Sequence, residues 1–196
     1  MTGALQVRHL AQSGHRRLGI VTVDDRSVAM FGDPRRQGVR ETTAAMGPLP
    51  PLELVLDSRE TAAAMGIKLP VEVWPGRNGG AAVGQVAETL RAWTTGPDPV
   101  TAVCCFNNLF AGLVIAAASS VGLAVPDHLS VIGVDDEPMS GFLQPALTTV
   151  RFDFEGTTAH AHALLRASLD GKKTPPLPDG EFVELVERES GAPLNR

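Results

Sequence analysis

The sequence predicts an α/β fold built on a doubly wound parallel sheet. Segments typical of strands alternate with segments typical of helices along the 196 residues, and the central strand segments are continuously apolar. Strands in which apolar and polar residues do not alternate are typical of a parallel sheet that helices cover on both faces. Short links join the segments, as expected for right-handed crossovers.

The first half of the chain predicts three helices and three strands. Apolar residues at helical spacing, closed by Gly14, indicate the first helix. The second helix is indicated by Asp33 as its N-cap and by Pro34 at its first helical position. A short third helix is expected to begin after Ser58, which would cap it. The helices are expected over 3–14, 33–47 and 58–66, and the strands over 16–23, 52–56 and 68–74.

The second half predicts three further helices and four strands. Phe110, Leu113 and Val114 belong to an apolar helical face, and Gly122 ends that helix. The helices are expected over 79–93, 107–122 and 156–171, and the strands over 100–106, 129–134, 147–154 and 181–189.

Charge and cysteine content exclude several classes of protein. Lys and Arg number 17 against 22 Asp and Glu, a net charge of −5, whereas nucleic-acid modules usually carry a basic face. No zinc spacing surrounds Cys104 and Cys105, which we expect to be buried, free thiols on opposite faces of a strand. The N-terminus lacks the apolar core of a signal peptide, and no apolar run approaches about 18 residues. A cytoplasmic protein without membrane contact is expected.

Polar side chains follow most strands of the predicted sheet. In an open parallel sheet, ligands bind beyond the carboxyl ends of the strands, close to where the strand order reverses. Amides, carboxylates and an indole plate at one edge suit a small ligand rich in hydroxyl groups. The residues concerned are Asp24, Asp25, Trp74, Asn107, Asn108, Asp135 and Asp136.

Each of these residues also has a purely structural interpretation. Asn107 and Asn108 precede a helix and could cap it, and Asp135 could simply form a turn. Trp74 could pack in the core. The four aspartates could also hold Mg²⁺, although no lysine or threonine follows the later strands to complete a phosphoryl-acceptor pocket. The convergence of the residues, rather than any single one, favours a ligand site.

Motifs for catalysis are lacking in the sequence. It contains no G-x-S-x-G elbow, Walker loop or G-x-G-x-x-G fingerprint. His160 and His162 are two residues apart on a predicted helix, so they do not share a face as metal ligands would. We therefore expect no enzymatic activity, no cofactor and no metal site.

Four stretches of the sequence resemble the sensor part of lactose-repressor (LacI/GalR) family regulators. They are "GHRRLGIV", "PRRQGVRE", "GLAVPDHLSVIGVDDEP" followed by "QPALTTV", and "FVELVERES". The similarity covers residues 3–45 and 98–190 and is weak over 47–70. It implies a two-lobed periplasmic-binding-protein-like fold, with a small effector between the lobes and a homodimer that presents DNA-binding headpieces.

The resemblance also implies how the chain is divided. The C-terminal lobe is expected to be nearly complete, over about 16–150 and 181–196. The N-terminal lobe is expected to be partial, over about 1–14 and 151–175. The headpiece is expected to be absent, so that operator DNA is reached only through a part that this chain lacks. Periplasmic sugar-binding proteins of transport or chemotaxis systems share the fold and form the alternative.

Five residues match positions that bind the effector in this family. Arg35 resembles the arginine that contacts the effector, and Trp74 resembles the aromatic residue that stacks on it. Asn107 and Asn108 occupy a polar pair, in which the family usually has aspartate at the position of Asn108. Asp135 resembles the aspartate that binds hydroxyl groups of a sugar-like or nucleoside-like effector. Asp136 and Glu137 are expected to be turn and surface groups.

Overall fold

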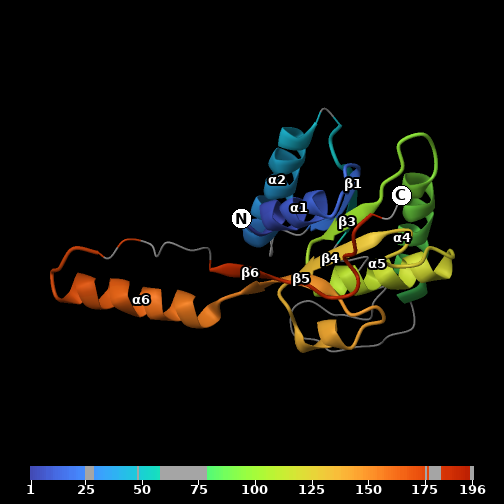
Figure 1. Ribbon diagram of the computed structural model, residues 1–196. Helices are drawn as coiled ribbons and strands as arrows, with labels where there is room; N and C mark the ends of the chain where they lie inside the picture. The colour runs from blue at the N-terminus through green and yellow to red at the C-terminus, as the bar shows by residue number, and fades with distance from the viewer. Residues whose placement is uncertain (25–28, 48, 58–78, 175, 177–181, 195–196) are drawn as a thin grey trace.

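A mostly parallel sheet forms the centre of the structure, a computed structural model that describes residues 1–24, 29–47, 49–57, 79–174, 176 and 182–194. The strands lie in the order β2-β1-β3-β4-β5-β6 (Figure 1). All neighbours pair in parallel except β5 and β6, which are antiparallel. The strands are β1 (Leu18–Asp24), β2 (Leu52–Asp57), β3 (Ala102–Cys105), β4 (Ser130–Val134), β5 (Thr148–Phe152) and β6 (Val183–Val186). The predicted α/β class is confirmed.

Helices connect the strands much as the sequence predicts. They are α1 (Thr2–Gln12), α2 (Ala29–Met46), α4 (Gly79–Thr94), α5 (Asn108–Ser120) and α6 (Phe154–Leu169), with a short 3-10 helix η1 (Pro138–Gly141). The prediction for the start of α2 is wrong, because the helix already runs from Ala29 and contains Pro34 in its interior. The helix expected over 58–66 and the strand expected over 68–74 lie outside the described residues.

Two apolar layers enclose the sheet because its strands are apolar on both sides. On one face Ile20, Cys104 and Ile132 pack against α1 and α2. On the other face Val21 and Cys105 pack against α4 and α5. Adjacent residues of a strand point to opposite faces, so the two cysteines lie in different layers, both buried and free as expected. Burial raises the pKa of the Cys104 thiol to about 12.

Helix α1 belongs to the body that surrounds the sheet. Val7 and Leu10 are fully buried against Leu18 and Ile20, and α1 packs against α2. The physical reason for this placement is the apolar stripe of α1, which the sheet covers. The assignment of residues 1–14 to the N-terminal lobe stays a prediction.

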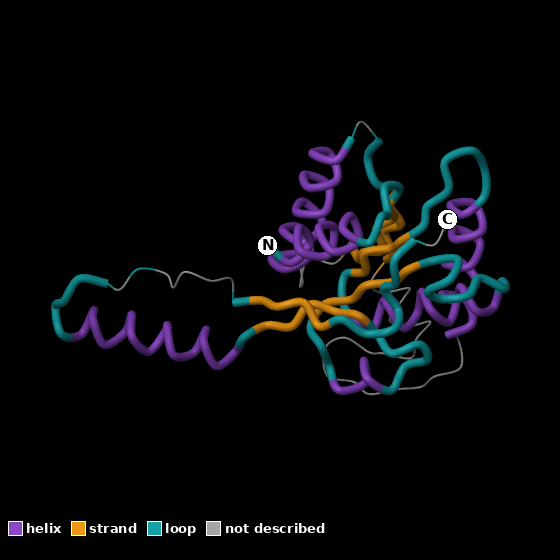
Figure 2. The backbone as a smooth tube through the Cα atoms, in the orientation of Figure 1, coloured by secondary structure: helices purple, strands orange, loops and turns teal. Residues whose placement is uncertain are grey.

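Helix α6 projects away from this body on the ribbon formed by β5 and β6 (Figures 1 and 2). Several of its apolar side chains are exposed, among them Phe154, Leu165 and Leu169. The bounds of the two lobes remain a prediction. None of the helices in the described part of the chain is long and apolar enough to cross a membrane.

The strand order reverses between β1 and β3. From β1 the chain adds β2 on one side and then continues on the other side with β3, β4 and β5. The carboxyl ends of these strands meet at one edge of the sheet, where the reversal leaves a crevice in folds of this kind. The segments that leave β3 and β4 at this edge carry Asn107 and Asp135.

Candidate functional site

An ion pair between Arg35 and Asp135 marks the carboxyl edge of the sheet. Arg35 Nη2 donates to Asp135 Oδ1 at 2.7 Å, and Arg35 Nη1 donates to the carbonyl oxygen of Phe106 at 2.8 Å. The side chain of Arg35 is 12% exposed and that of Asp135 is 31% exposed. Two candidates that lie 100 residues apart in the sequence are thus brought together, with the carboxylate still open to solvent.

Two aromatic rings hold the guanidinium of Arg35 in place. Its Cζ lies 5.0 Å from the ring centroid of Phe106 and 5.7 Å from that of Phe152. Such cation–π contacts fix the plane of the guanidinium group, and its N–H groups can still donate hydrogen bonds within that plane. Phe152 also lines a cavity of about 560 Å³ at the base of α6. Phe152 therefore contacts the guanidinium of Arg35 and also lines this cavity.

The close crossing of α1 and α2 sets the position of Arg35. A Cβ atom at Gly3 would lie 2.1 Å from the Arg35 carbonyl oxygen and 2.9 Å from the backbone nitrogen of Val39. Gly38 faces the same crossing from α2, where a Cβ would lie 3.2 Å from the backbone nitrogen of Ala4. Two glycines thus let the helices touch, and the backbone that carries Arg35 rests directly on α1.

Asp135 has an unusual backbone conformation. Its φ is 96°, and the φ of the next residue, Asp136, is 44°. Positive φ is uncommon for residues other than glycine, although Asp and Asn adopt it more readily than most. Strained residues of this kind gather at ligand-binding and catalytic sites. The turn after β4 therefore presents the Asp135 carboxylate to the edge of the sheet in a conformation that the chain does not favour by itself.

Asn107 and Asn108 have structural partners. Asn107 caps α5, because its Oδ1 accepts from the backbone N–H of Phe110 at 3.1 Å. Asn108 is 4% exposed; its Nδ2 donates to Ser140 Oγ and its Oδ1 accepts from Thr149 Oγ1, both at 2.7 Å. The capping alternative thus describes Asn107. Asn108 connects α5 to η1 and β5, and its role toward a ligand remains a prediction.

The remaining candidates are placed as follows. Trp74 and Asp25 lie outside the described residues, and Asp24 is exposed at the end of β1. Glu137 is an exposed turn residue ahead of η1, as expected. Within the described residues no three His, Cys, Asp or Glu side chains gather as a metal site would require. Because Asp25 lies outside these residues, the four-aspartate magnesium alternative is not tested.

The expectation for Asp136 is wrong in one respect. It is a turn residue, but its side chain is only 8% exposed and accepts from Arg151 Nε and Arg188 Nη2, each at 2.7 Å. Burial raises the pKa of Asp136, but the hydrogen bonds and charges of the two arginines outweigh burial and hold the pKa below its ordinary value. Its partners are 15 and 52 residues away, so no local pattern reveals this role.

Gln6 is a further residue that sequence reasoning missed. It is 2% exposed on α1, and its Nε2 lies within hydrogen-bonding distance of the carbonyl oxygens of Cys105, Ile132 and Gly133, at 3.1 to 3.2 Å. These carbonyls lie at the carboxyl ends of β3 and β4. Gln6 thus fixes the strand ends from which the candidate site extends. A buried polar residue on the apolar face of a predicted helix is the signal that could have found it.

The fold and this polar edge define a ligand-binding domain of the periplasmic-binding-protein type. The family model described as a periplasmic binding protein-like domain matches residues 7–191. An uncharacterized HTH-type transcriptional regulator of Streptomyces limosus is 33% identical over 191 residues, which are 96% of this chain and 47% of that protein. The regulator GalR of Escherichia coli is 28% identical over 95% of this chain and 48% of its own length.

A solved structure shares the same fold. The LacI family regulator of Arthrobacter sp. FB24, in complex with lactose, superimposes with a TM-score of 0.64 at 24% identity, covering 96% of this chain and 63% of that one. The chain belongs to the LacI/GalR family of transcriptional regulators and carries its effector-binding domain. It spans about half the length of the curated relatives that it matches along nearly all of its residues.

Proposed function

We propose that this domain senses a small polar effector, sugar-like or nucleoside-like, at the carboxyl edge of its sheet. The observation that carries the proposal is the Arg35–Asp135 pair, which places a guanidinium group beside a partly exposed carboxylate at the carboxyl edge of the sheet. Carboxylates accept hydrogen bonds from hydroxyl groups, and a guanidinium donates to them. Trp74, Asn107 and Asn108 are proposed to complete the site.

The effector is proposed to act through DNA binding in the intact regulator. Its affinity would differ between two arrangements of the lobes, only one of which suits a headpiece on operator DNA. The names of the matched relatives as transcriptional regulators support this role over a sugar-binding protein of a transport or chemotaxis system. They also support a cytoplasmic protein that is not an enzyme.

A panel of ligands tests the proposal directly. Melting of the chain is followed by scanning fluorimetry with lactose, other mono- and disaccharides, nucleosides, and uncharged non-polyols of similar size as controls. Because a ligand that binds only the folded state stabilises it by mass action, a true effector raises the Tm in proportion to the logarithm of its concentration. A panel in which no sugar or nucleoside raises the Tm more than the controls do would contradict the proposed effector class.

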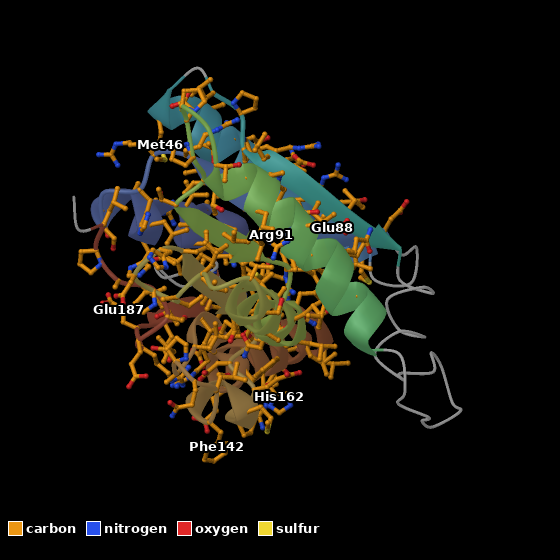
Figure 3. All side chains as sticks on the ribbon, turned by 90° about the vertical axis from the view of Figure 1, so that its right-hand side faces the viewer. Met46, Glu88, Arg91, Phe142, His162 and Glu187 are labelled. Atoms are coloured by element: carbon orange, nitrogen blue, oxygen red, sulfur yellow. The ribbon has the colours of Figure 1, made fainter. Side chains whose placement is uncertain are left out.

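We also propose that the chain forms a homodimer through α5 and η1. Leu109 and Met139 are exposed and line a cavity of about 450 Å³ between these elements. Phe142, which follows η1, is 77% exposed and points outward from the body (Figure 3). Exposed apolar groups that gather in one patch are typical of protein interfaces.

Phe142→Asp is expected to dissociate this dimer, because a carboxylate in an apolar interface loses its hydration without gaining a partner. Sedimentation velocity on the wild-type chain and the variant measures the effect as a change from dimer to monomer. Phe154→Asp is the matched control, because Phe154 is also an exposed phenylalanine but lies on α6. Dissociation by both variants alike, or by neither, would refute the interface.

A further inference from the structure

Asp136 is bound to two segments that are distant in the sequence. Its Oδ1 accepts from Arg188 Nη2 and its Oδ2 accepts from Arg151 Nε, each at 2.7 Å. Arg151 lies on β5, and Arg188 follows β6. Both carboxylate oxygens of a nearly buried side chain are thus engaged, on the residue directly after Asp135.

The two arginines are themselves anchored. Arg188 Nη1 donates to the Leu147 carbonyl oxygen at 2.8 Å, and the Arg188 backbone N–H donates to Thr148 Oγ1 at 2.9 Å. Arg151 Nη1 donates to Glu184 Oε1 at 3.0 Å. The triad therefore joins the turn after β4 to β5 and to the segment that follows β6.

The turn needs such an anchor because its backbone is strained. Asp135 and Asp136 both have positive φ, at 96° and 44°. Backbone conformations of this kind persist only where surrounding contacts enforce them. The Asp135 N–H donates to the Val150 carbonyl oxygen at 2.8 Å, which fixes one end of the turn. The side-chain bonds of Asp136 fix the other end.

We propose that Asp136 is a positioning residue: held by Arg151 and Arg188, it keeps the turn after β4 in the strained conformation that directs the Asp135 carboxylate toward Arg35. Its effect on the effector rests on the proposed function, whereas its effect on the turn stands on the contacts above. The lowered pKa of Asp136 agrees with this role, because the carboxylate stays ionised and paired at neutral pH.

The alternative is that the triad contributes only to overall stability. In that case its loss would accelerate opening of the whole fold and would not single out the turn. Amide hydrogen exchange separates the two cases, because it measures opening residue by residue. The Asp135 amide reports on the turn, and the Phe106 amide, which donates to the Val21 carbonyl oxygen at 2.9 Å between β3 and β1, reports on the sheet.

The variant that tests the proposal is Asp136→Asn, because Asn has nearly the same side-chain shape as Asp and also tolerates positive φ. Its amide nitrogen is a donor, so it cannot accept the hydrogen bond from one of the two arginines. We expect exchange at Asp135 to accelerate about tenfold while exchange at Phe106 stays unchanged. Glu184→Gln is the control, because Glu184 accepts a hydrogen bond from Arg151 and its substitution leaves both bonds to Asp136 in place. Unchanged exchange at Asp135 in the Asp136 variant, or equal acceleration at Asp135 and Phe106, would overturn the proposal.

Titration with lactose, as a probe, adds a second readout. If lactose binds the wild-type chain, the Asp136→Asn variant is expected to bind about tenfold more weakly, the scale for one misplaced charged hydrogen bond, and equal binding would overturn the inferred effect on the effector. If lactose does not bind the wild-type chain, the exchange data still decide whether Asp136 positions Asp135. A failure of the proposed effector class is thereby distinguished from a failure of the positioning role.

Discussion

Gly3→Ala is expected to lower the free energy of unfolding by about 3 kcal/mol, at the upper end of the usual cost of overpacking. The added methyl group would lie 2.1 Å from the Arg35 carbonyl oxygen, and backbone at this distance cannot yield as a flexible side chain can. The two helices must separate, which exposes apolar contacts such as those of Val39 and moves Arg35. Urea denaturation followed by circular dichroism measures the change.

Gly84→Ala is the matched control for this prediction. Gly84 also lies inside a helix, α4, but a Cβ there meets nothing within 4 Å. Alanine loses less backbone entropy on folding than glycine, so this variant is expected to be more stable by about 0.5–1 kcal/mol. If both variants shift the urea midpoint in the same direction, the close crossing of α1 and α2 is not what Gly3 provides.

Asn108→Ala is expected to destabilise the chain by about 2–3 kcal/mol. Asn108 is buried, and its amide group satisfies the Ser140 and Thr149 hydroxyl groups. Truncation leaves the Thr149 hydroxyl without its acceptor in a buried position and removes the link from α5 to β5. Ser140 keeps its hydrogen bond to the Glu137 carbonyl oxygen, which limits the loss.

The neighbouring residue provides the control for Asn108. Asn107→Ala removes only the cap of α5, for which about 1 kcal/mol is expected. A double-mutant cycle of Asn108→Ala with Thr149→Val isolates the bond between the two side chains, and we expect a favourable coupling between them. Wild-type stability of the Asn108 variant would mean that its hydrogen bonds to Ser140 and Thr149 do not stabilise the framework.

The fold was predictable because its signals are local. Strands that are apolar on both faces, such as β3 and β4, indicate a covered parallel sheet before any contact is known. The position of Asp135 directly after the 129–134 segment also predicted that it would lie at the carboxyl edge of the sheet, as it does after β4. The division of the chain into two lobes stays a prediction, although α6 lies outside the body that surrounds the sheet (Figure 1).

The rest could not be predicted because it depends on partners that are distant in the sequence. Nothing near Asn108 shows that Thr149 and Ser140 will satisfy its amide group. Nothing near Asp136 shows that two arginines will bury its carboxylate. The start of α2 was missed for another reason: Pro34 suits a first helical turn, and the contacts of α2 with α1 and β1 outweigh its cost inside the helix.

Calorimetric titration of an Asp135→Gly variant tests the central claim most directly. Glycine suits the φ of 96°, so the variant removes the carboxylate without adding strain. With the effector found in the ligand panel, we expect the Asp135→Gly variant to lose about 1–3 kcal/mol in binding free energy. The control is Asp98→Ala, at an exposed loop position before β3, which is expected to bind the effector as the wild-type chain does. Equal affinity of the Asp135→Gly variant and the wild-type chain would contradict a site built on the Arg35–Asp135 pair.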